Sequence, residues 1–524
     1  MVLEAPFQNK VNESLQKIAE GSSITFIGLI LSLLPLFIIR LIIVRQWTES
    51  DYGIFSLVLS ILSICTIIGG LGLYSGLSRN IAYVRGLGEY QKIPVYISAS
   101  VWFSFIASAV ISFLIFIFSE YVSENFFHTT ALVIPLKIIS FTIPFYTLIN
   151  IIVTIYRGFD QVKPTVYFQQ ILVNTLFLIL MMILIIFDNS FVNIFYAFDV
   201  SIVFTFVILV YYSIKKIQTL EIFSTKSLKS PFSKELLISS FPLLITSIFI
   251  VIISWADTIL LGVLRNTTEV GLYNAAIPLA QIISFPLTAL LLIHLPIFTG
   301  LFAKNKSEKI KRSYSILTKW LCYVTLPFFF LLFLYPEPII IFLFGQNYVS
   351  ATFALRILSI GYIVNNLNGP CGMTLVVMGR YRFEMFSWIF AAIIGVVLNI
   401  ALIPSYGLEG AAFATGSAII IANLIKSWKL YTISGAQPLS KNLLKPTFLF
   451  MIIITPIYLI SKFLFTIEWW MTPMLFILFY IIYLLAILVT KSLDVEDIGM
   501  IQLFEKKTKI KLSLIKWVYQ KMND

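Results

Sequence analysis

The stretch LIIVRQWTESDYGIF, residues 41–55, interrupts two long apolar runs with an Arg, a Thr-Glu pair and a Gly. A related stretch, LLGVLRNTTEVGLY, occupies residues 260–273. At an offset of 220 residues, Arg265, Thr268 and Glu269 repeat Arg45, Thr48 and Glu49. After a short gap, Gly271-Leu272-Tyr273 repeats Gly53-Ile54-Phe55. Repetition of this kind, in order and at a nearly constant spacing, indicates that one structural unit occurs twice in the chain.

The composition predicts a membrane protein. Hydrophobic residues make up 59% of the chain and charged residues 12%, whereas about a quarter of the residues of a soluble domain are charged. Apolar runs of about 20 residues recur along the chain, and each is long enough to cross a hydrocarbon core of roughly 30 Å as a helix. We expect an all-α polytopic membrane protein with about fourteen transmembrane helices, the second of which covers residues 53–78.

The distribution of charge predicts the orientation in the membrane. Most of the 37 Lys and Arg residues fall on one predicted side, for example in segments 214–234 and 304–312, and the outer loops hold only Arg45 and Arg265. This bias is the positive-inside signature, so we expect both termini in the cytoplasm and the protein in the cell membrane. The net charge of +12 is therefore a topology signal and does not indicate nucleic-acid binding. The tail is basic and amphipathic, which is typical of a segment lying on an anionic leaflet.

The repeat also predicts the domain organisation. Each repeat holds six expected spans, so both repeats enter the membrane from the same side and form parallel lobes. We expect two six-helix lobes and two added C-terminal helices, an arrangement in which transporters place a site between the lobes. The alternative is a duplicated scaffold without transport. The expected divisions are an N-terminal lobe at 1–213, a cytoplasmic linker at 214–234, a C-terminal lobe at 235–433, two helices at 434–490 and a tail at 491–524.

Several stretches resemble one transporter family. The turn Arg-x-x-Thr-Glu-x-x-Tyr-Gly at residues 45–53 is similar to the Arg-x-Leu-Gly-Pro-Glu-x-Tyr-Gly turn of Wzx-type polysaccharide flippases. GLGLYSGLSRNIAY at 70–83, YRGFDQVKP at 156–164, EVGLYNAA at 269–276 and YGLEGAAFAT at 406–415 also fit that family in the expected order. These flippases belong to the multidrug/oligosaccharidyl-lipid/polysaccharide (MOP) exporter superfamily, which includes the MATE multidrug exporters. The chain departs from the family turn by having Gln-Trp and Ser-Asp where Leu-Gly-Pro is usual.

The resemblance implies a function and leaves two alternatives. It implies a flippase that moves an isoprenoid-(pyro)phosphate-linked oligosaccharide from the inner to the outer leaflet by alternating access, for surface polysaccharide or glycoconjugate synthesis. A cation-coupled MATE-like multidrug antiporter and a lipid II flippase are the alternatives within the superfamily.

The sequence also bounds the chemistry and the partners. The sequence contains no P-loop, no metal-binding motif and no long outer loop with paired acids. We therefore expect that the protein is not an enzyme and that it binds no metal or cofactor, apart from a coupling H⁺ or Na⁺. The expected partners are the lipid-linked oligosaccharide and membrane lipids. We expect a monomer that associates with other polysaccharide-assembly proteins.

Five cations are candidates for binding the anionic head group, because an Arg fork suits phosphate and charged residues in spans usually face a cavity or a partner. Arg79 and Arg157 lie at cytoplasmic helix ends, where positive-inside anchoring is the alternative. Arg40 and Lys137 lie within or near apolar runs, where snorkelling to the nearer interface is the alternative. Arg356 lies only a few residues into its helix, and snorkelling is favoured there.

Three groups are candidates for binding a coupling ion. Asp199 and Asp257 lie inside expected spans, and His294 precedes Pro296 in another. Asp257 is favoured because it lies in the polar set Ser-Trp-Ala-Asp-Thr, and a buried structural ion pair is the alternative for both acids. Neutral polar side chains on the spans could bind sugar hydroxyls or form helix–helix hydrogen bonds instead; they are Asn150, Gln169, Gln170, Asn174, Gln281, Asn365, Asn366 and Asn399.

Overall fold

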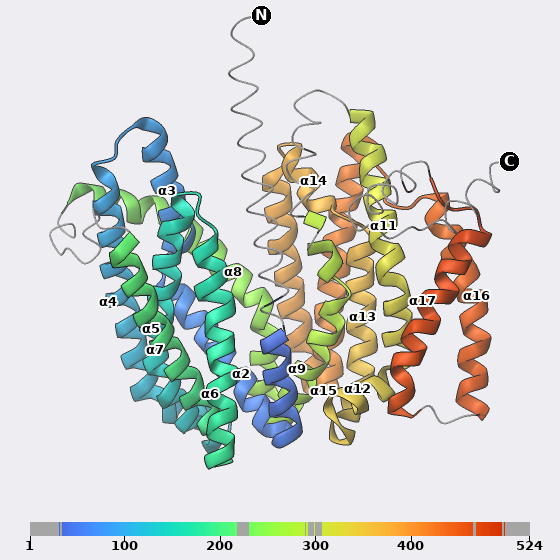
Figure 1. Cartoon of the computed structure of the whole chain (residues 1–524), viewed down its shortest axis with the longest axis horizontal. Helices are drawn as coiled ribbons and strands as arrows, with labels where there is room; N and C mark the ends of the chain where they lie inside the picture. The colour runs from blue at the N-terminus through green and yellow to red at the C-terminus, as the bar shows by residue number, and fades with distance from the viewer. Residues whose placement is uncertain are drawn as a thin grey trace, which may run out of the picture. The chain divides into compact units, whose positions relative to one another are not determined.

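The computed structural model describes residues 31, 34–216, 230–288, 290–291, 298, 307–464, 468–494 and 497. The described chain is helical and contains no strand, and eleven of its helices are long and apolar enough to cross a membrane (Figure 1). The all-α polytopic fold predicted from the sequence is therefore confirmed. The count of fourteen stays a prediction, because residues 22–30, 32 and 33 of the first expected span, 22–45, lie outside the described residues; residue 31 and residues 34–46 are helical.

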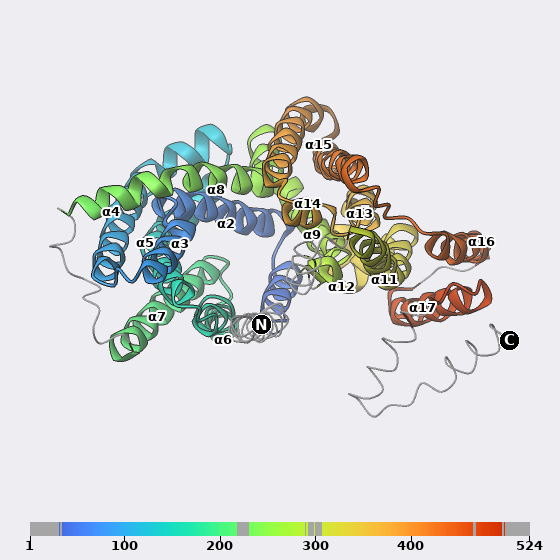
Figure 2. The same ribbon diagram turned by 90° about the horizontal axis from the view of Figure 1, so that it is seen from above.

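The chain divides into two compact units, and unit 1 comprises residues 1–274 and 399–407. Its centre is α5, which packs against α2, α3, α4 and α7 (Figure 2). The helix α8 packs on α2, α3 and α4, so unit 1 extends past the expected linker, and the division into lobes at residues 213 and 235 stays a prediction. The main helices of unit 1 are α2 (Glu49–Gly69), α3 (Leu73–Leu87), α4 (Lys92–Tyr121), α5 (Val133–Gly158), η3 (Thr165–Leu172), α6 (Val173–Phe187), α7 (Asn193–Lys216), α8 (Pro231–Leu264) and the first half of α9 (Thr267–Ile282).

Unit 2 comprises residues 275–398 and 408–524. Its helix α11 packs against α13, α16 and α17, which attaches the two C-terminal helices to this unit. Its helices are α11 (Ser307–Leu334), α12 (Pro336–Phe344), α13 (Thr352–Leu367), α14 (Cys371–Val377), α15 (Tyr381–Ser434, apart from residues 399–407), α16 (Lys441–Leu464) and α17 (Thr472–Val489). The long α15 covers two expected spans joined at Gly407, whose backbone is not helical (φ 55°, ψ −132°).

The two related turns start α2 and α9 with different capping chemistry. Thr48 caps α2: its hydroxyl oxygen accepts the backbone N–H of Asp51 at 3.2 Å, and the Asp51 carboxylate accepts the Thr48 N–H at 3.1 Å. This reciprocal pair satisfies two amide donors that a helix start leaves free. In α9 the side chain of Asn266 accepts the Glu269 N–H at 2.9 Å instead. Polar residues in both turns therefore set where the following helix begins.

The two turns also touch each other inside unit 1, where the starts of α2 and α9 cross with their backbones in contact. A Cβ placed on Gly53 would lie 1.8 Å from the Thr267 carbonyl oxygen, and one on Gly271 would lie 1.9 Å from the Glu49 carbonyl oxygen. The Ser50 and Thr267 hydroxyls share a hydrogen bond of 2.7 Å beside the crossing. Glycine at both positions therefore allows the backbones of α2 and α9 to come into contact.

We predict that Gly53→Ala and Gly271→Ala each destabilise the protein by about 1–3 kcal/mol, because the added methyl group would force two backbones apart. Thermal unfolding of the purified protein in detergent measures the effect. Gly86→Ala is the matched control, since Gly86 lies in α3 with no atom within 4 Å of its would-be Cβ. Equal unfolding midpoints for all three variants would show that the crossing tolerates a side chain.

Candidate functional site

The second expected span is not one helix. We expected a continuous helix over 53–78, but α2 ends at Gly69 and α3 begins at Leu73. Leu71 and Gly72 take positive φ values of 50° and 75°, which a helix does not allow. The Gly-rich sequence makes the break possible, because glycine adopts positive φ at little cost. Broken helices at membrane depth are tolerated where they are buried in protein or line a cavity.

The break is filled by a tyrosine. The Tyr74 ring lies over Gly70, where a Cβ would come within 2.6 Å of it, and the Tyr74 hydroxyl donates to the Thr66 carbonyl at 2.8 Å. On the other side, Gly76 packs on Ser240 of α8, and a Cβ there would lie 2.0 Å from the Ser240 hydroxyl oxygen. The helices α3 and α8 are therefore closely packed beside the break.

A second irregular helix lies close by. The segment η3 (Thr165–Leu172) is a π-helix, a rare form that is frequent at functional sites. Its Gln169 side chain donates to the Asn150 side-chain oxygen of α5 at 2.6 Å. The side-chain oxygens of Gln170 and of Thr147 on α5 are buried without a hydrogen-bond partner. A π-helix beside α5 therefore places amide groups against a polar helix face.

The polar face of α5 connects both irregular helices. Thr147, Asn150, Thr154 and Arg157 follow one another at three- or four-residue steps and so share one face. The Thr154 hydroxyl lies 3.3 Å from the carbonyl oxygen of Tyr74, and the Arg157 guanidinium donates to the Thr154 hydroxyl at 2.7 Å. We refer to these four residues with Tyr74, Gln169 and Gln170 as the α5 polar cluster.

The α5 polar cluster has the groups that a sugar phosphate needs. Amides and hydroxyls can donate to and accept from sugar hydroxyls, and a guanidinium can bind phosphate through two parallel hydrogen bonds. Within the described chain no carboxylate pairs with Arg157, whose residue is exposed, so most of its donors are available to an anion. Arg79 is likewise exposed on α3, and no contact joins it to the cluster.

The other predicted cations make local contacts. Lys137 pairs with Glu120 of α4 at 2.7 Å, and both side chains are exposed. Arg356 donates to the Phe333 carbonyl at 3.0 Å and so satisfies a carbonyl in the last turn of α11. Arg40 is half-buried in the helical segment 34–46. None of these three joins the α5 polar cluster through a recorded contact, so their substrate role stays a prediction.

The predicted coupling groups lie in different places. Asp257 is buried in α8, where its carboxylate accepts the Tyr273 hydroxyl at 2.6 Å and the Thr258 N–H at 2.7 Å. Asp199 on α7 accepts the Thr142 hydroxyl at 2.8 Å. His294 lies outside the described residues. Asp257 is therefore the more enclosed of the two acids, in a polar setting that the Ser-Trp-Ala-Asp-Thr set anticipated.

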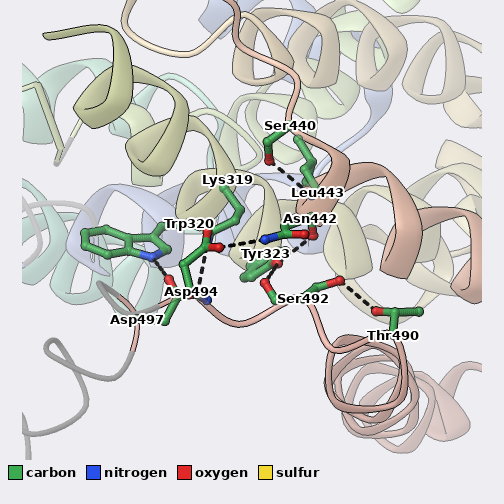
Figure 3. A network of polar contacts seen from close by, with 10 residues as sticks. All are labelled: Lys319, Trp320, Tyr323, Ser440, Asn442, Leu443, Thr490, Ser492, Asp494 and Asp497. Atoms are coloured by element: carbon green, nitrogen blue, oxygen red, sulfur yellow. Dashed lines mark hydrogen bonds and ion pairs between the residues drawn. The ribbon is translucent and has the colours of Figure 1, made fainter. Parts of the chain in front are cut away.

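Sequence reasoning missed two buried lysines in unit 2, Lys319 and Lys426, which are 1% and 3% exposed. Figure 3 shows the first: the Lys319 ammonium contacts Asp494 and lies 2.7 Å from the Asp497 carboxylate. Asp494 also accepts from the Asn442 amide at 2.6 Å, and Asp497 from the Trp320 indole at 2.5 Å. The network joins the chain beyond α17 to α11 and α16. Only the Asp-x-x-Asp spacing in the tail could have drawn attention to it.

We predict that Gln169→Leu destabilises the protein by about 1–3 kcal/mol, because the buried Asn150 oxygen would lose its donor. Gln170→Leu is the matched variant on the same helix and should be neutral or stabilising, since it removes a buried oxygen that has no partner. Thermal unfolding of both variants measures the difference. A larger loss for Gln170→Leu than for Gln169→Leu would contradict the hydrogen-bond pattern of the cluster.

Comparison with known sequences agrees with the fold. The family model described as "Polysaccharide biosynthesis protein" matches residues 18–302, more than half of the chain, and the MatE model matches residues 242–401. An uncharacterized membrane protein of Methanocaldococcus jannaschii is 23% identical over 454 residues, which cover 82% of this chain and 86% of that protein. The probable low-salt glycan biosynthesis flippase Agl15 of Haloferax volcanii is 24% identical over 33% of this chain and 36% of its own. The teichuronic acid biosynthesis protein TuaB of Bacillus subtilis is 30% identical over 32% of each chain.

Solved structures show the same fold at low identity. The lipid II flippase MurJ in an inward closed conformation aligns with a TM-score of 0.69 and 16% identity, over 90% of this chain and 98% of its own. An inward-facing multidrug resistance transporter of the MATE family aligns with a TM-score of 0.64 and 15% identity, over 77% and 95%. The chain therefore belongs to the polysaccharide biosynthesis protein family, and it is a multi-pass membrane protein with the fold of these MOP-superfamily structures.

Proposed function

We propose that this protein is a flippase that moves an isoprenoid-phosphate- or pyrophosphate-linked oligosaccharide from the inner to the outer leaflet by alternating access. The α5 polar cluster carries the proposal, because it combines amide and hydroxyl groups with a guanidinium beside a broken helix and a π-helix. An anionic sugar head group needs this combination, since it crosses hydrocarbon only at prohibitive cost. The names of two partial relatives, a glycan flippase and a teichuronic acid synthesis protein, support the same substrate class.

The electrostatics of the cluster favour an anionic substrate over a cationic drug. Arg157 is the charged residue of the cluster, and Arg85 nearby donates to the Gly158 carbonyl at 2.7 Å and pairs with Asp160 at 3.1 Å. In the topology expected from sequence, with both termini in the cytoplasm of the cell, this end of α5 faces the cytoplasm. The head group would thus meet Arg157 first and the amides deeper in the unit. A lipid II flippase has the same requirement and differs only in the glycan.

Transport against a gradient needs an energy source, and we propose coupling to H⁺ or Na⁺. Asp257 is the preferred group in unit 1, because its carboxylate is buried and accepts the Tyr273 hydroxyl and the Thr258 N–H. Asp199 is the second candidate. Substrate and coupling ion would then bind to different helices of the same unit. We expect the transporter to act as a monomer alongside other polysaccharide-assembly proteins.

We predict that Arg157→Ala weakens binding of the lipid-linked substrate roughly tenfold to hundredfold, since hydrogen bonds to charged groups contribute about 1.5–3 kcal/mol. Cells that lack the gene should accumulate lipid-linked oligosaccharide on the inner leaflet and lose surface glycan. Wild type should restore both and Arg157→Ala should not, whereas Lys163→Ala, which removes an exposed cation just before η3, should restore both.

Two outcomes would overturn the proposal. Normal surface glycan together with increased drug sensitivity in the deletion strain would favour the multidrug exporter. A loss of cell-wall peptidoglycan synthesis with intact surface glycan would favour the lipid II flippase. Expression and membrane insertion of each variant are checked by immunoblot, so that a folding defect is not read as a transport defect.

A further inference from the structure

The helix α7 ends in two cations that no acid of the described chain neutralises. Lys215 and Lys216 are its last two residues, and both are exposed. Two other lysines of unit 1 differ from them, because Lys92 pairs with Glu89 and Lys137 pairs with Glu120. The recorded contacts of Lys215 and Lys216 within the described chain are all with tyrosines.

Two tyrosines one helical turn earlier hold these ammonium groups in place. The Lys215 ammonium lies 4.6 Å from the centroid of the Tyr211 ring, and the Lys216 ammonium lies 5.1 Å from that of the Tyr212 ring. The Lys216 ammonium also donates to the Tyr212 hydroxyl oxygen at 2.7 Å. An ammonium has three donors and a phenol has one, so donors without a recorded acceptor in the described chain gather at this helix end.

The end of α7 is fixed against α5 and η3. The Tyr156 hydroxyl of α5 donates to the Ser213 hydroxyl at 3.0 Å, and the Lys216 ammonium lies 5.9 Å from the centroid of the Tyr156 ring. The Phe168 ring of η3 lies 5.3 Å from the Tyr212 ring. These contacts position the cations before any ligand arrives, which reduces the entropy that binding would cost.

The outer face of α7 is apolar and leads along the helix to this cationic end. It consists of five side chains at three- or four-residue steps, each between 50% and 59% exposed: Val200, Phe204, Val207, Tyr211 and Ile214. The helix lies at the edge of unit 1 (Figure 2). A contiguous exposed apolar surface marks contact with a membrane or with another protein. A ligand that fits both features is anionic at one end and apolar along its length.

We propose that the end of α7 binds the phosphate head group of an anionic phospholipid, whose acyl chains lie along the outer face of α7. Ammonium groups bind phosphate as point charges, and hydrogen bonds from charged donors are stronger than those between neutral groups. Inorganic phosphate would use the same donors but would leave the apolar face uncovered. A zwitterionic lipid would bring a cation that the two lysines repel.

This lipid site is distinct from the α5 polar cluster. Tyr156 and Arg157 are consecutive in α5, so their side chains leave the helix about 100° apart. Tyr156 contacts the end of α7, whereas Arg157 donates to Thr154. The phospholipid is therefore a stable partner of the protein and is separate from the substrate that the α5 polar cluster is proposed to bind.

Native mass spectrometry of the full-length protein in detergent tests the proposal. Phosphatidylglycerol, phosphatidylcholine with the same acyl chains, and inorganic phosphate are titrated separately, with no oligosaccharide present. We expect wild type to bind phosphatidylglycerol at concentrations at which the other two do not bind. Replacing both Lys215→Gln and Lys216→Gln should weaken this binding about tenfold to thirtyfold. Replacing both Lys92→Gln and Lys137→Gln is the matched control: it removes the same charge from lysines that already have carboxylate partners, and binding should not change.

Three results would overturn the proposal. They are equal binding of the two phospholipids by wild type, unchanged phosphatidylglycerol binding when Lys215 and Lys216 are both replaced, and a wild-type dimer that this replacement abolishes, since a second copy would then cover the face.

Thermal unfolding of the unaltered protein provides a measurement that needs no variant. Phosphatidylglycerol should raise the unfolding temperature more than phosphatidylcholine does, and the difference should shrink at high salt, which screens exposed charges. A difference that salt leaves unchanged would contradict head-group binding by the lysines. Neither experiment measures transport, so its result is independent of the flippase assignment.

Discussion

The contact between Gly53 and Gly271 constrains the rest of unit 1. Two helix starts from opposite halves of the sequence repeat meet there backbone to backbone, and neither glycine can acquire a side chain without displacing the other helix. The contact fixes α9 against α2 and so directs α8 along α2 and α3, where Ser240 closes on Gly76. The repetition of the turn therefore has a structural reason, because each copy is the surface against which the other packs.

In the same unit the helix is broken between α2, which ends at Gly69, and α3, which begins at Leu73. A membrane offers no water to unpaired backbone groups, so a broken helix there must find its partners within the protein. Tyr74 supplies one by donating to Thr66, and its own carbonyl lies within hydrogen-bond distance of Thr154. The same Thr154 receives a hydrogen bond from Arg157, so the groups that repair the break are continuous with those proposed to meet the substrate. Thr154 therefore contacts both the backbone at the break and the guanidinium that is proposed to bind the substrate.

Sequence reasoning succeeded where a pattern extends over many residues. Apolar runs predicted the helical membrane fold, and the repeated turns indicated a unit that occurs twice, whose copies begin helices capped by Thr48 and Asn266. It failed where the backbone of two residues decides the geometry: the run at Gly69–Gly76 is apolar enough for a continuous span, yet positive φ at Leu71 and Gly72 breaks the helix. Contacts between distant residues, such as Lys319 with Asp497 or Lys426 with Glu384, leave no periodic trace because their sequence separations are arbitrary. For the same reason the sequence could not show that Arg157, among the five candidate cations, donates to Thr154.

The network around Lys319 has a consequence for how the protein is made. Its carboxylate partners Asp494 and Asp497 lie 175 and 178 residues further along the chain. During synthesis the ribosome therefore releases α11 into the membrane with an ammonium that has no counter-charge until α12 to α17 have followed it. Unit 2 must remain open at this point, or hold Lys319 in water, through the translation of its remaining helices. These ion pairs form only in a chain translated past Asp497, so the packing of unit 2 around Lys319 is completed late in its assembly.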